Sequence, residues 1–451
     1  MPKAWIVLGL GYGDEGKGSW VDALTRRTGA RINVRFNGGP QAAHHVAAPD
    51  GRVHCFSQIG SGSLIPEVET YFSGHCFFDP IALGLELQTL RTLGFPCEGR
   101  RIHIDPHCPL VTPWHGLVNR IQERARGRSA HGTCGRGMGI LFADLREAGS
   151  QVPRASDLWA PERLARRLAQ TRQRMIARAE SIARDAPPDA QIEGWLADLY
   201  TPEMLGWVGD HFRTLCQREE LDLADLDWLR QRRGETLIFE GAQGVLLDQD
   251  LGDWPHVTPS HTTDTNAQAI LDAIDFLGER QCLGVLRTYA TRHGAGPLVS
   301  ESPELARQLP EPHNGDAGWQ GAMRMGWFDL VASRRGIAST GGIQGLLLSC
   351  IDRFQGAQWC AGYQTNCAHW GALEALLVRD QDGIIREIHP PVGLSFDQRA
   401  ALSRYLGACQ PQLQPSAGER PHAQAIAEAL QVPLLGFSQG PTALDKRWCS
   451  P

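Results

Sequence analysis

A glycine-rich segment near the N-terminus has the residue types and the spacing of a phosphate-binding loop. Residues 11–19 read GYGDEGKGS, and the step from the first glycine to Gly16 and Lys17 matches the pattern GxxxxGK. In such loops the glycines let backbone N–H groups approach a phosphate chain, and the lysine adds a positive charge. Gly18 stands where an ordinary Walker loop has Ser or Thr. The carboxylate of Asp14 would repel phosphate unless it binds Mg²⁺ or takes a proton during the reaction.

The flanking segments predict the elements that position this loop. Residues 4–9 form a continuous apolar run, which is typical of a strand buried on both faces of a parallel sheet. A helix is expected to begin at Ser19, and this strand–loop–helix context favours phosphate binding over a purely structural glycine turn. Further strands are predicted at residues 31–36, 236–240, 283–289 and 346–351. The alternation of strands and helices predicts an α/β fold with a large, mainly parallel central sheet.

Residues 150–233 have a different character. Ala, Arg, Leu and Gln dominate residues 158–185, Asp157 is placed to cap a helix there, and Pro187 follows its end. Helical patterning continues through residues 192–233. We therefore expect residues 150–233 to be a mainly helical insertion within the α/β unit.

Bulk composition excludes several classes of protein. Lys plus Arg number 44 and Asp plus Glu number 50, and the resulting formal net charge of −6 does not indicate a nucleic-acid partner. No apolar run is long enough to cross a bilayer, so no membrane partner is expected. The 12 cysteines are scattered without a CxxC pair, which favours reduced thiols and a cytoplasmic location.

Seven blocks of this sequence resemble motifs of the adenylosuccinate synthetase family, and they occur in the family's order. They read GDEGKG at 13–18, GGPQAAH at 38–44, GTCGRGMG at 132–139, FEGAQGVLLD at 239–248, VTPSHTT at 257–263, TRHGAGP at 291–297 and SQGP at 438–441. The combination of GDEGKG with FEGAQG is specific. The resemblance implies the family's fold, with residues 1–451 as a single catalytic domain that contains the helical insertion, and it implies a homodimer.

The family joins L-aspartate to IMP and uses GTP and Mg²⁺, so the resemblance implies a GTP-dependent carbon–nitrogen ligase of purine nucleotide biosynthesis. Removal of the N1 proton lets the C6 oxygen of IMP take the γ-phosphoryl group, and phosphate leaves when an amine attacks C6. Asp14 matches the general base and a metal contact, and Ala43 matches the position of another metal contact. His44 matches the residue that stabilises the transferring phosphoryl group, and Lys17 neutralises phosphate charge.

The resemblance assigns further residues to the two nucleotide sites. Asp352 matches a carboxylate that reads the N1–H and amino group of guanine through two parallel bonds. The alternatives are a solvated loop histidine for His44, a turn-capping carboxylate for Asp352 and a structural cation for Arg136. The residues assigned to GTP are Gly13, Glu15, Gly16, Gly18, Asp352, Ser438 and Gly440, and those assigned to the substrates are Gln41, Thr133, Arg136, Gln243, Thr258 and Arg324.

The sequence departs from the family's pattern where substrates would bind. Gln41 replaces an asparagine, Cys134 a threonine, and Cys350 the lysine of the TKLD motif beside the guanine. Residues 297–326 predict an exposed loop, and within it the family's run of four arginines, which holds the carboxylates of aspartate, is reduced to Arg324. Since Met and Ala cannot replace arginine as receptors of a dicarboxylate, we expect weak aspartate binding or a different amine. We also expect GTP to be preferred over ATP less sharply than in the family.

Three hypotheses follow for the function. The first is ordinary adenylosuccinate synthesis, with a purine nucleotide and an amino-acid-like amine as small-molecule partners. The second is a divergent paralogue that uses another 6-oxopurine nucleotide, such as a guanine nucleotide, or another amine. Arg292 or Arg334 could still supply a cation for aspartate, which would favour the first hypothesis over the second. The third is a non-catalytic nucleotide sensor, but a pure binder has no need for Asp14 inside its phosphate loop or for His44.

Overall fold

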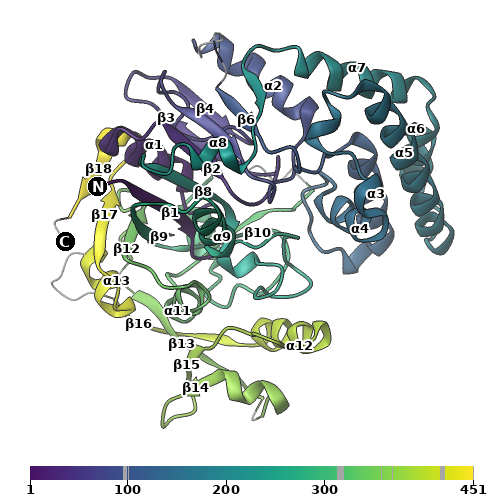
Figure 1. Cartoon of the computed structure of the whole chain (residues 1–451). Helices are drawn as coiled ribbons and strands as arrows, with labels where there is room; N and C mark the ends of the chain where they lie inside the picture. The colour runs from purple at the N-terminus through teal and green to yellow at the C-terminus, as the bar shows by residue number, and fades with distance from the viewer. Residues whose placement is uncertain are drawn as a thin grey trace.

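The computed structural model describes residues 1–94, 99, 101–311, 319–356, 358–367, 369–416 and 422–449 of the 451-residue chain. Figure 1 shows a twisted central sheet with helices on its faces. Helices formed between residues 80 and 216 gather on one side of the sheet, and a smaller lobe that contains residues 358–415 projects at the lower end. Residues 312–318, which belong to the predicted exposed loop at 297–326, lie outside the described residues.

Ten strands form the central sheet in the order β18-β17-β12-β9-β1-β8-β2-β5-β6-β7. Their bounds are β1 Lys3–Gly9, β2 Ile32–Arg35, β5 Glu69–Phe72, β6 Ile102–Ile104, β7 Leu221–Leu223, β8 Leu237–Gly244, β9 Glu279–Arg287, β12 Gly345–Ser349, β17 Leu434–Ser438 and β18 Lys446–Trp448. Neighbouring strands are parallel except β17 and β18, which are antiparallel. The prediction of an α/β fold with a large, mainly parallel sheet is confirmed, and each predicted strand overlaps a strand of this sheet.

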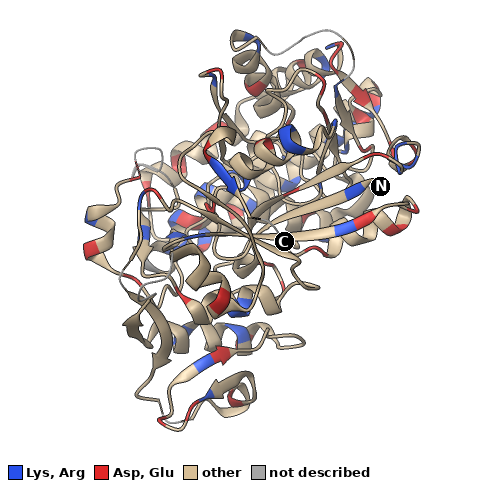
Figure 2. Cartoon of the chain, turned by 90° about the vertical axis from the view of Figure 1, so that its left-hand side faces the viewer, with Lys and Arg blue, Asp and Glu red and all other residues tan. Residues whose placement is uncertain are grey.

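The described residues form three smaller sheets and a set of helices around the central sheet. The smaller sheets comprise β3 His44–Ala47 with β4 Val53–Phe56, β10 Ala290–His293 with β11 Met323–Gly326, and β13 Gln358–Gln364, β14 Leu377–Arg379, β15 Ile385–Ile388 and β16 Gln410–Pro415. The α-helices are α1 Lys17–Thr28, α2 Pro80–Thr92, α3 Pro113–Arg126, α4 Met138–Ala148, α5 Pro161–Asp185, α6 Ala190–Tyr200, α7 Glu203–Cys216, α8 Leu226–Arg230, α9 Thr265–Ala273, α10 Pro303–Gln308, α11 Leu330–Ala338, α12 Phe396–Gly407 and α13 His422–Leu430. Within the described ranges no helix has the length and apolar character needed to cross a membrane. Figure 2 shows acidic and basic residues interspersed over the fold.

Strand β1 contributes to a different hydrophobic core on each face of the sheet. Ile6 and Leu8 pack in one core with residues of α9 and α13, whereas Val7 packs in the other with Trp20 of α1. Because successive side chains of a strand point to opposite faces, burial on both sides requires an uninterrupted apolar run. The loop after β1 consequently emerges at the carboxyl edge of the sheet, where open α/β folds bind their ligands.

Residues 150–233 contain helices α5 to α8 and the short strand β7. The predicted cap of the first helix is wrong, because α5 begins at Pro161 rather than directly after Asp157. Asp157 ends a 3-10 turn, where it accepts the N–H of Arg154 and pairs with Arg163. The assignment of residues 150–233 as an insertion within a single catalytic domain stays a prediction.

The predicted exposed loop at residues 297–326 is wrong over two stretches. Helix α10 occupies part of it, and Ser302 caps this helix by accepting the N–H of Leu305 at 3.3 Å. Strand β11 occupies another part and pairs antiparallel with β10. Both elements are short, and β11 is recognisable only through its partner strand, so local sequence patterning does not reveal it.

Candidate active site

The loop between β1 and α1 takes its shape from three residues with positive φ. The φ angles are 95° at Gly13, 62° at Asp14 and 93° at Gly16. Glycine adopts such angles without steric cost, and aspartate tolerates them better than most other residues. The backbone carbonyl of Asp14 also accepts a hydrogen bond from Arg287 Nε, so an arginine at the end of β9 holds the loop in this conformation.

The carboxylate of Glu15 fills the inside of this loop. Its Oε1 accepts the N–H groups of Gly11 at 3.1 Å and Gly13 at 2.7 Å, and its Oε2 accepts Lys17 Nζ at 2.9 Å. Glu15 and Lys17 are both buried. Backbone N–H groups and a lysine are the donors with which such loops bind phosphate. The predicted donor set is therefore assembled, with a side-chain anion in the position of a phosphate.

Gly18 lies where α1 meets the strand that begins at His44. A Cβ atom at Gly18 would lie 2.7 Å from the Cβ of His44 and 2.9 Å from Ser61 Oγ, which is closer than packed side chains approach. The glycine therefore accounts for the departure from the Walker pattern. Without a side chain at this position, His44 can lie directly beside the phosphate loop.

His44 is fixed by Glu240, a buried carboxylate on β8. The two side chains are hydrogen-bonded through His44 Nδ1 and Glu240 Oε1. Glu240 also accepts the N–H of Ser61 at 2.8 Å and its hydroxyl at 2.5 Å, and Arg35 Nη1 lies 3.8 Å away. Burial alone would raise the pKa of Glu240, but Arg35 and the hydrogen bonds from His44 and Ser61 lower it to about 2. Sequence reasoning missed Glu240, although a carboxylate at the end of an apolar run was a usable signal.

The ionised state of Glu240 determines which nitrogen of His44 carries a proton. An ionised carboxylate only accepts hydrogen bonds, so Nδ1 of His44 must be the donor. Burial lowers the pKa of His44 below its usual value, and the bond to Glu240 offsets only part of this effect. The neutral ring then presents Nε2 as an acceptor, and the charged ring presents it as a donor. A polyphosphate beside the ring favours the charged form, because opposite charges at short distance stabilise ionisation.

Arg287 connects the phosphate loop to two other segments. Besides the Asp14 carbonyl, it contacts Glu311, whose Oε1 accepts its Nη1 at 2.6 Å. Arg353 donates to the same carboxylate oxygen at 2.5 Å. Arg353 directly follows Asp352, the predicted reader of guanine. These contacts were also missed from the sequence, since none of the three residues lies in a recognisable motif.

The segments predicted to read the nucleotide base lie against the phosphate loop and against each other. A Cβ atom at Gly16 would lie 3.0 Å from Ser349 Oγ, at the end of β12. The N–H of Ile351 donates to the carbonyl of Ser438 at 3.2 Å, which joins the segments after β12 and β17. Asp352 is exposed. The geometry therefore places an exposed carboxylate on the segment next to the phosphate loop.

Two glutamines predicted to bind the purine substrate have unsatisfied side-chain oxygens. The Oε1 atoms of Gln41 and Gln243 are buried and have no hydrogen-bond partner within the described part of the chain. A Cβ atom at Gly38 would lie 3.0 Å from Gln243 Oε1. These oxygens can accept N–H groups of a ligand. Thr258 follows in the loop after β8, where its N–H bonds the carbonyl of Leu247 at 2.8 Å.

The predicted phosphate-contacting loop after α3 is held by that helix. Glu123 accepts the N–H groups of Gly132 at 2.9 Å and Thr133 at 3.1 Å. The hydroxyl of Thr133 is hydrogen-bonded to the amide of Asn119 at 3.1 Å. A substrate phosphate would have to replace these bonds to use Thr133. Arg136, in contrast, is exposed and is available to an anionic substrate.

Arg324 is bonded to the protein rather than directed to open space. Its guanidinium donates to two carbonyls of the turn 294–296, at 3.0 and 2.7 Å, and pairs with Glu301 at 2.8 Å. Arg292 and Arg334, the two suggested replacements, likewise donate to main-chain carbonyls. A substrate carboxylate would have to displace these acceptors. The single arginine that remains of the family's arginine run is thus already bonded within the protein, which adds to the difference from the family's arginine loop.

Asp14 has the chemistry of a Mg²⁺ ligand. Its side chain is partly exposed, and within the described residues its carboxylate has no hydrogen-bond or ion-pair partner. Carboxylate oxygen is the donor type that Mg²⁺ prefers. Ala43, which offers only its backbone, is exposed in the turn just before His44. The residues present therefore fit the metal implied by the resemblance.

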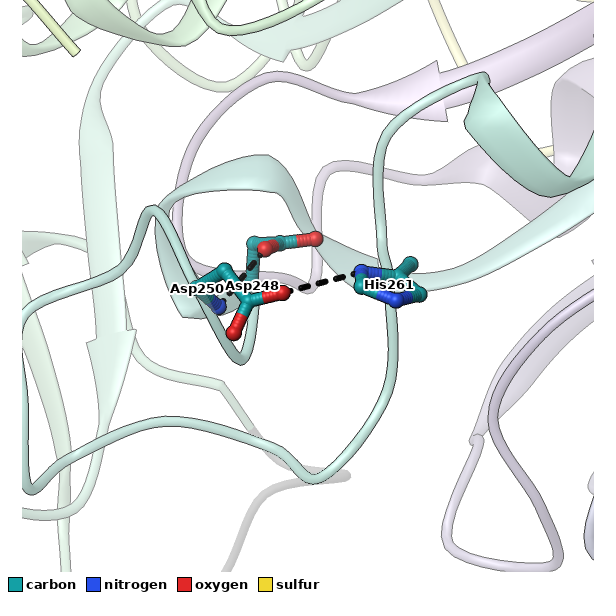
Figure 3. A group of neighbouring side chains, drawn as sticks. All are labelled: Asp248, Asp250 and His261. Atoms are coloured by element: carbon teal, nitrogen blue, oxygen red, sulfur yellow. Dashed lines mark hydrogen bonds and ion pairs between the residues drawn. The ribbon is translucent and has the colours of Figure 1, made fainter. Parts of the chain in front are cut away.

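A second group of possible metal ligands lies in the loop after β8. Figure 3 shows Asp248 and Asp250 facing His261. The oxygens of Asp248 accept the N–H groups of Asp250 at 2.9 Å, Leu251 at 3.2 Å and Thr262 at 2.7 Å. These bonds show that Asp248 organises the loop, while Asp250 is exposed and His261 is half-buried.

The fold and the site together define a nucleotide-dependent phosphoryl-transferring enzyme. The features that define it are the mainly parallel sheet, the phosphate loop, the carboxylate inside that loop and the histidine beside it. A family model described as adenylosuccinate synthetase matches residues 6–375. The chain is 35% identical over 379 residues to the adenylosuccinate synthetase of Alkalilimnicola ehrlichii, covering 83% of each chain. It is 31% identical over 458 residues to that of Shewanella oneidensis, covering 98% of this chain and 97% of the relative. The chain belongs to the adenylosuccinate synthetase family and is a GTP- and Mg²⁺-dependent ligase of purine nucleotide biosynthesis.

Solved structures show the same fold at low sequence identity. A fully ligated adenylosuccinate synthetase from Plasmodium falciparum has a TM-score of 0.72 at 18% identity, with 99% of each chain covered. The succinoaminodeoxyadenylate synthetase of cyanophage S-2L, bound to dGMP and to dATP as an energy donor, has a TM-score of 0.58 at 15% identity, covering 100% of this chain and 96% of that one. Both likenesses concern the fold.

Proposed function

We propose that the chain phosphorylates the 6-oxygen of IMP with GTP and then adds L-aspartate, with Asp14, Lys17, His44 and Glu240 in the chemical steps. The observation that carries this proposal is the hydrogen bond between His44 and the ionised Glu240 directly beside the phosphate loop. A phosphate binder needs the loop alone. A buried carboxylate that fixes the position of the proton on a histidine prepares that ring to stabilise charge that develops on a reacting group.

The proposed reaction has two steps. Asp14 takes the N1 proton of IMP, the C6 oxygen attacks the γ-phosphorus of GTP, and the bond from that phosphorus to the β-phosphate oxygen breaks. Lys17 and charged His44 donate to the phosphate oxygens on which negative charge accumulates. In the second step the neutral amine nitrogen bonds to C6, the C6–oxygen bond breaks to release phosphate, and the proton that the nitrogen loses passes to the departing phosphate. Mg²⁺, held by Asp14 and the backbone at Ala43, would neutralise phosphate charge.

We expect IMP and aspartate to bind to Gln41, Gln243 and the exposed Arg136. Gln41 and Gln243 supply acceptors for ligand N–H groups, and Arg136 supplies a cation for a phosphate or a carboxylate. With Arg324 bonded elsewhere, the aspartate site has fewer free arginines than the family's motif provides. We further propose a cytoplasmic homodimer without nucleic-acid or membrane partners, which the family resemblance and the formal net charge of −6 support.

Positional isotope exchange tests the first step without any amine. GTP carrying ¹⁸O in the bridge between the β and γ phosphorus atoms is incubated with the enzyme, IMP and Mg²⁺. Reversible transfer to IMP scrambles the label into the non-bridging β positions, and we expect scrambling only when IMP is present. His44→Ala should abolish it. Scrambling without IMP, or none with IMP in an enzyme that binds both nucleotides, would contradict the proposed mechanism.

A further inference from the structure

Lys446 is a buried cation that the steps above do not use. It lies on the edge strand β18 of the central sheet (Figure 1), pairs in register with Ser438 of β17 and is 5% exposed. Its ammonium donates to Ser438 Oγ at 3.0 Å and to the carbonyl of Gly440 at 3.1 Å. The nitrogen also lies 5.3 Å from the ring centroid of Trp20. Burial lowers the pKa of Lys446 to about 8.

A lysine at this position stands out in a chain that otherwise uses arginine. Lys and Arg together number 44, and lysine occurs only as Lys3, Lys17 and Lys446. Lys3 is exposed and pairs with Glu279 at the protein surface. Lys446 has no ion-pair partner within the described ranges, although burying an unpaired ammonium is costly. Ser438 and Gly440 accept two of the three N–H groups of the ammonium, so one donor is left for a ligand.

The surroundings of Lys446 are the segments predicted to read the base. The carboxylates of Asp445, Asp22 and Asp352 favour the charged form of Lys446, and Ser438 is joined to the segment of Asp352 through Ile351. Cys350 stands where the family has a lysine beside the guanine. Lys446 on β18 therefore supplies a lysine charge near the segment where the family's lysine is replaced by Cys350.

We propose that Lys446 and Asp352 read the purine base of the phosphoryl donor as a pair, with the ammonium donating to O6 of guanine. The inference rests on the proposed function in taking Asp352 as the acceptor of the guanine N1–H and amino group. O6 is bonded to the carbon next to N1, so a base held on Asp352 carries O6 beside that carboxylate. Lysine is an established partner of guanine O6 and N7 in nucleic-acid recognition.

Adenine mismatches both members of this pair. Its 6-amino group would place a donor against the ammonium, and its N1 would place an acceptor against the carboxylate of Asp352. Selectivity of this kind is strong because a buried polar group is left without a partner. The replacement of the family's lysine by Cys350 is thus compensated by Lys446, and GTP preference is retained rather than weakened.

Calorimetric binding of GDP, IDP and ADP to the full chain separates the two readers. Lys446→Met should lower the affinity for GDP and for IDP, which both carry O6, by about 10- to 100-fold. It should not lower the affinity for ADP, because removal of the ammonium also removes the donor that opposes the 6-amino group of adenine. Asp352→Asn should lower GDP affinity more than IDP affinity, because IDP lacks the 2-amino group. Lys3→Met is the matched control and should change none of the three affinities.

An equal loss for GDP, IDP and ADP in Lys446→Met would assign the lysine a merely structural role and overturn the inference, as would an unchanged ratio of GDP to ADP affinity. Thermal melting monitors folding, and Lys446→Gln, which keeps a donor for Ser438 and Gly440, replaces the Met variant if that variant melts early. Because these measurements require no turnover, a failure of the isotope exchange would leave their outcome readable.

Discussion

Glu240 on β8 and His44 on β3 are hydrogen-bonded although 196 residues separate them in the chain. The predicted consequence is that Glu240→Gln lowers kcat by at least about two orders of magnitude while GDP binding is retained. The amide can present an N–H to Nδ1 of His44 and so permit the wrong ring tautomer. Steady-state kinetics paired with GDP titration measure both quantities. Ser61→Ala, which removes a hydroxyl bond to Glu240, should cost less; wild-type kcat in Glu240→Gln would refute the positioning role.

Asp14→Asn is expected to reduce turnover by about two orders of magnitude or more, because the amide cannot take a proton from the substrate. The variant should melt at the wild-type temperature, since the carboxylate has no partner within the described residues. Asp14→Ala should lose turnover to the same extent but melt at a lower temperature, because alanine is strained at a φ of 62°. Near-normal turnover in either variant would remove Asp14 from the chemistry.

Gly18→Ser, which restores the residue type of an ordinary Walker loop, should damage both stability and activity. The new Cβ would lie 2.7 Å from the Cβ of His44, and overpacking of this kind costs about 1–3 kcal/mol. Gly209→Ala in α7 is a matched control, because a Cβ there meets nothing within 4 Å and alanine favours the helix. Chemical denaturation and kcat compare the two variants. A Gly18→Ser enzyme with unchanged stability and rate would contradict the close approach of His44.

The amine site should bind L-aspartate weakly. Arg324 is bonded to the turn 294–296 and to Glu301, and charge-assisted bonds contribute about 1.5–3 kcal/mol each. Loss of two such bonds raises the Michaelis constant by about two orders of magnitude or more. Kinetics with IMP, GTP, Mg²⁺ and an aspartate series measure it, and Met323→Arg, which adds a guanidinium to the same strand, should lower it. A sub-millimolar constant with brisk turnover in the unmodified enzyme would defeat this expectation, and phosphate release with a different amine would redirect it.

The sequence revealed those features that depend on local pattern. The apolar run of β1, the glycines of the phosphate loop and the strand that carries Glu240 are readable because neighbouring residues determine them. Glu240 and Arg287 are bonded to residues 196 and 273 positions away in the chain, and no local pattern encodes such contacts. The sequence also cannot distinguish a free arginine from one bonded to carbonyls, which is why Arg324 was assigned to substrate.

The Glu15 carboxylate makes nucleotide binding an exchange of anions. Gly11, Gly13 and Lys17 already donate to this side chain, so a phosphate that takes these donors substitutes for existing hydrogen bonds and adds few new ones. The heat released in the loop is then small. The displaced carboxylate regains water and rotamer freedom, which favours binding through entropy. In calorimetry the contacts of the phosphate loop should therefore contribute little to the binding enthalpy. Most of the enthalpy of nucleotide binding should come from contacts with the base.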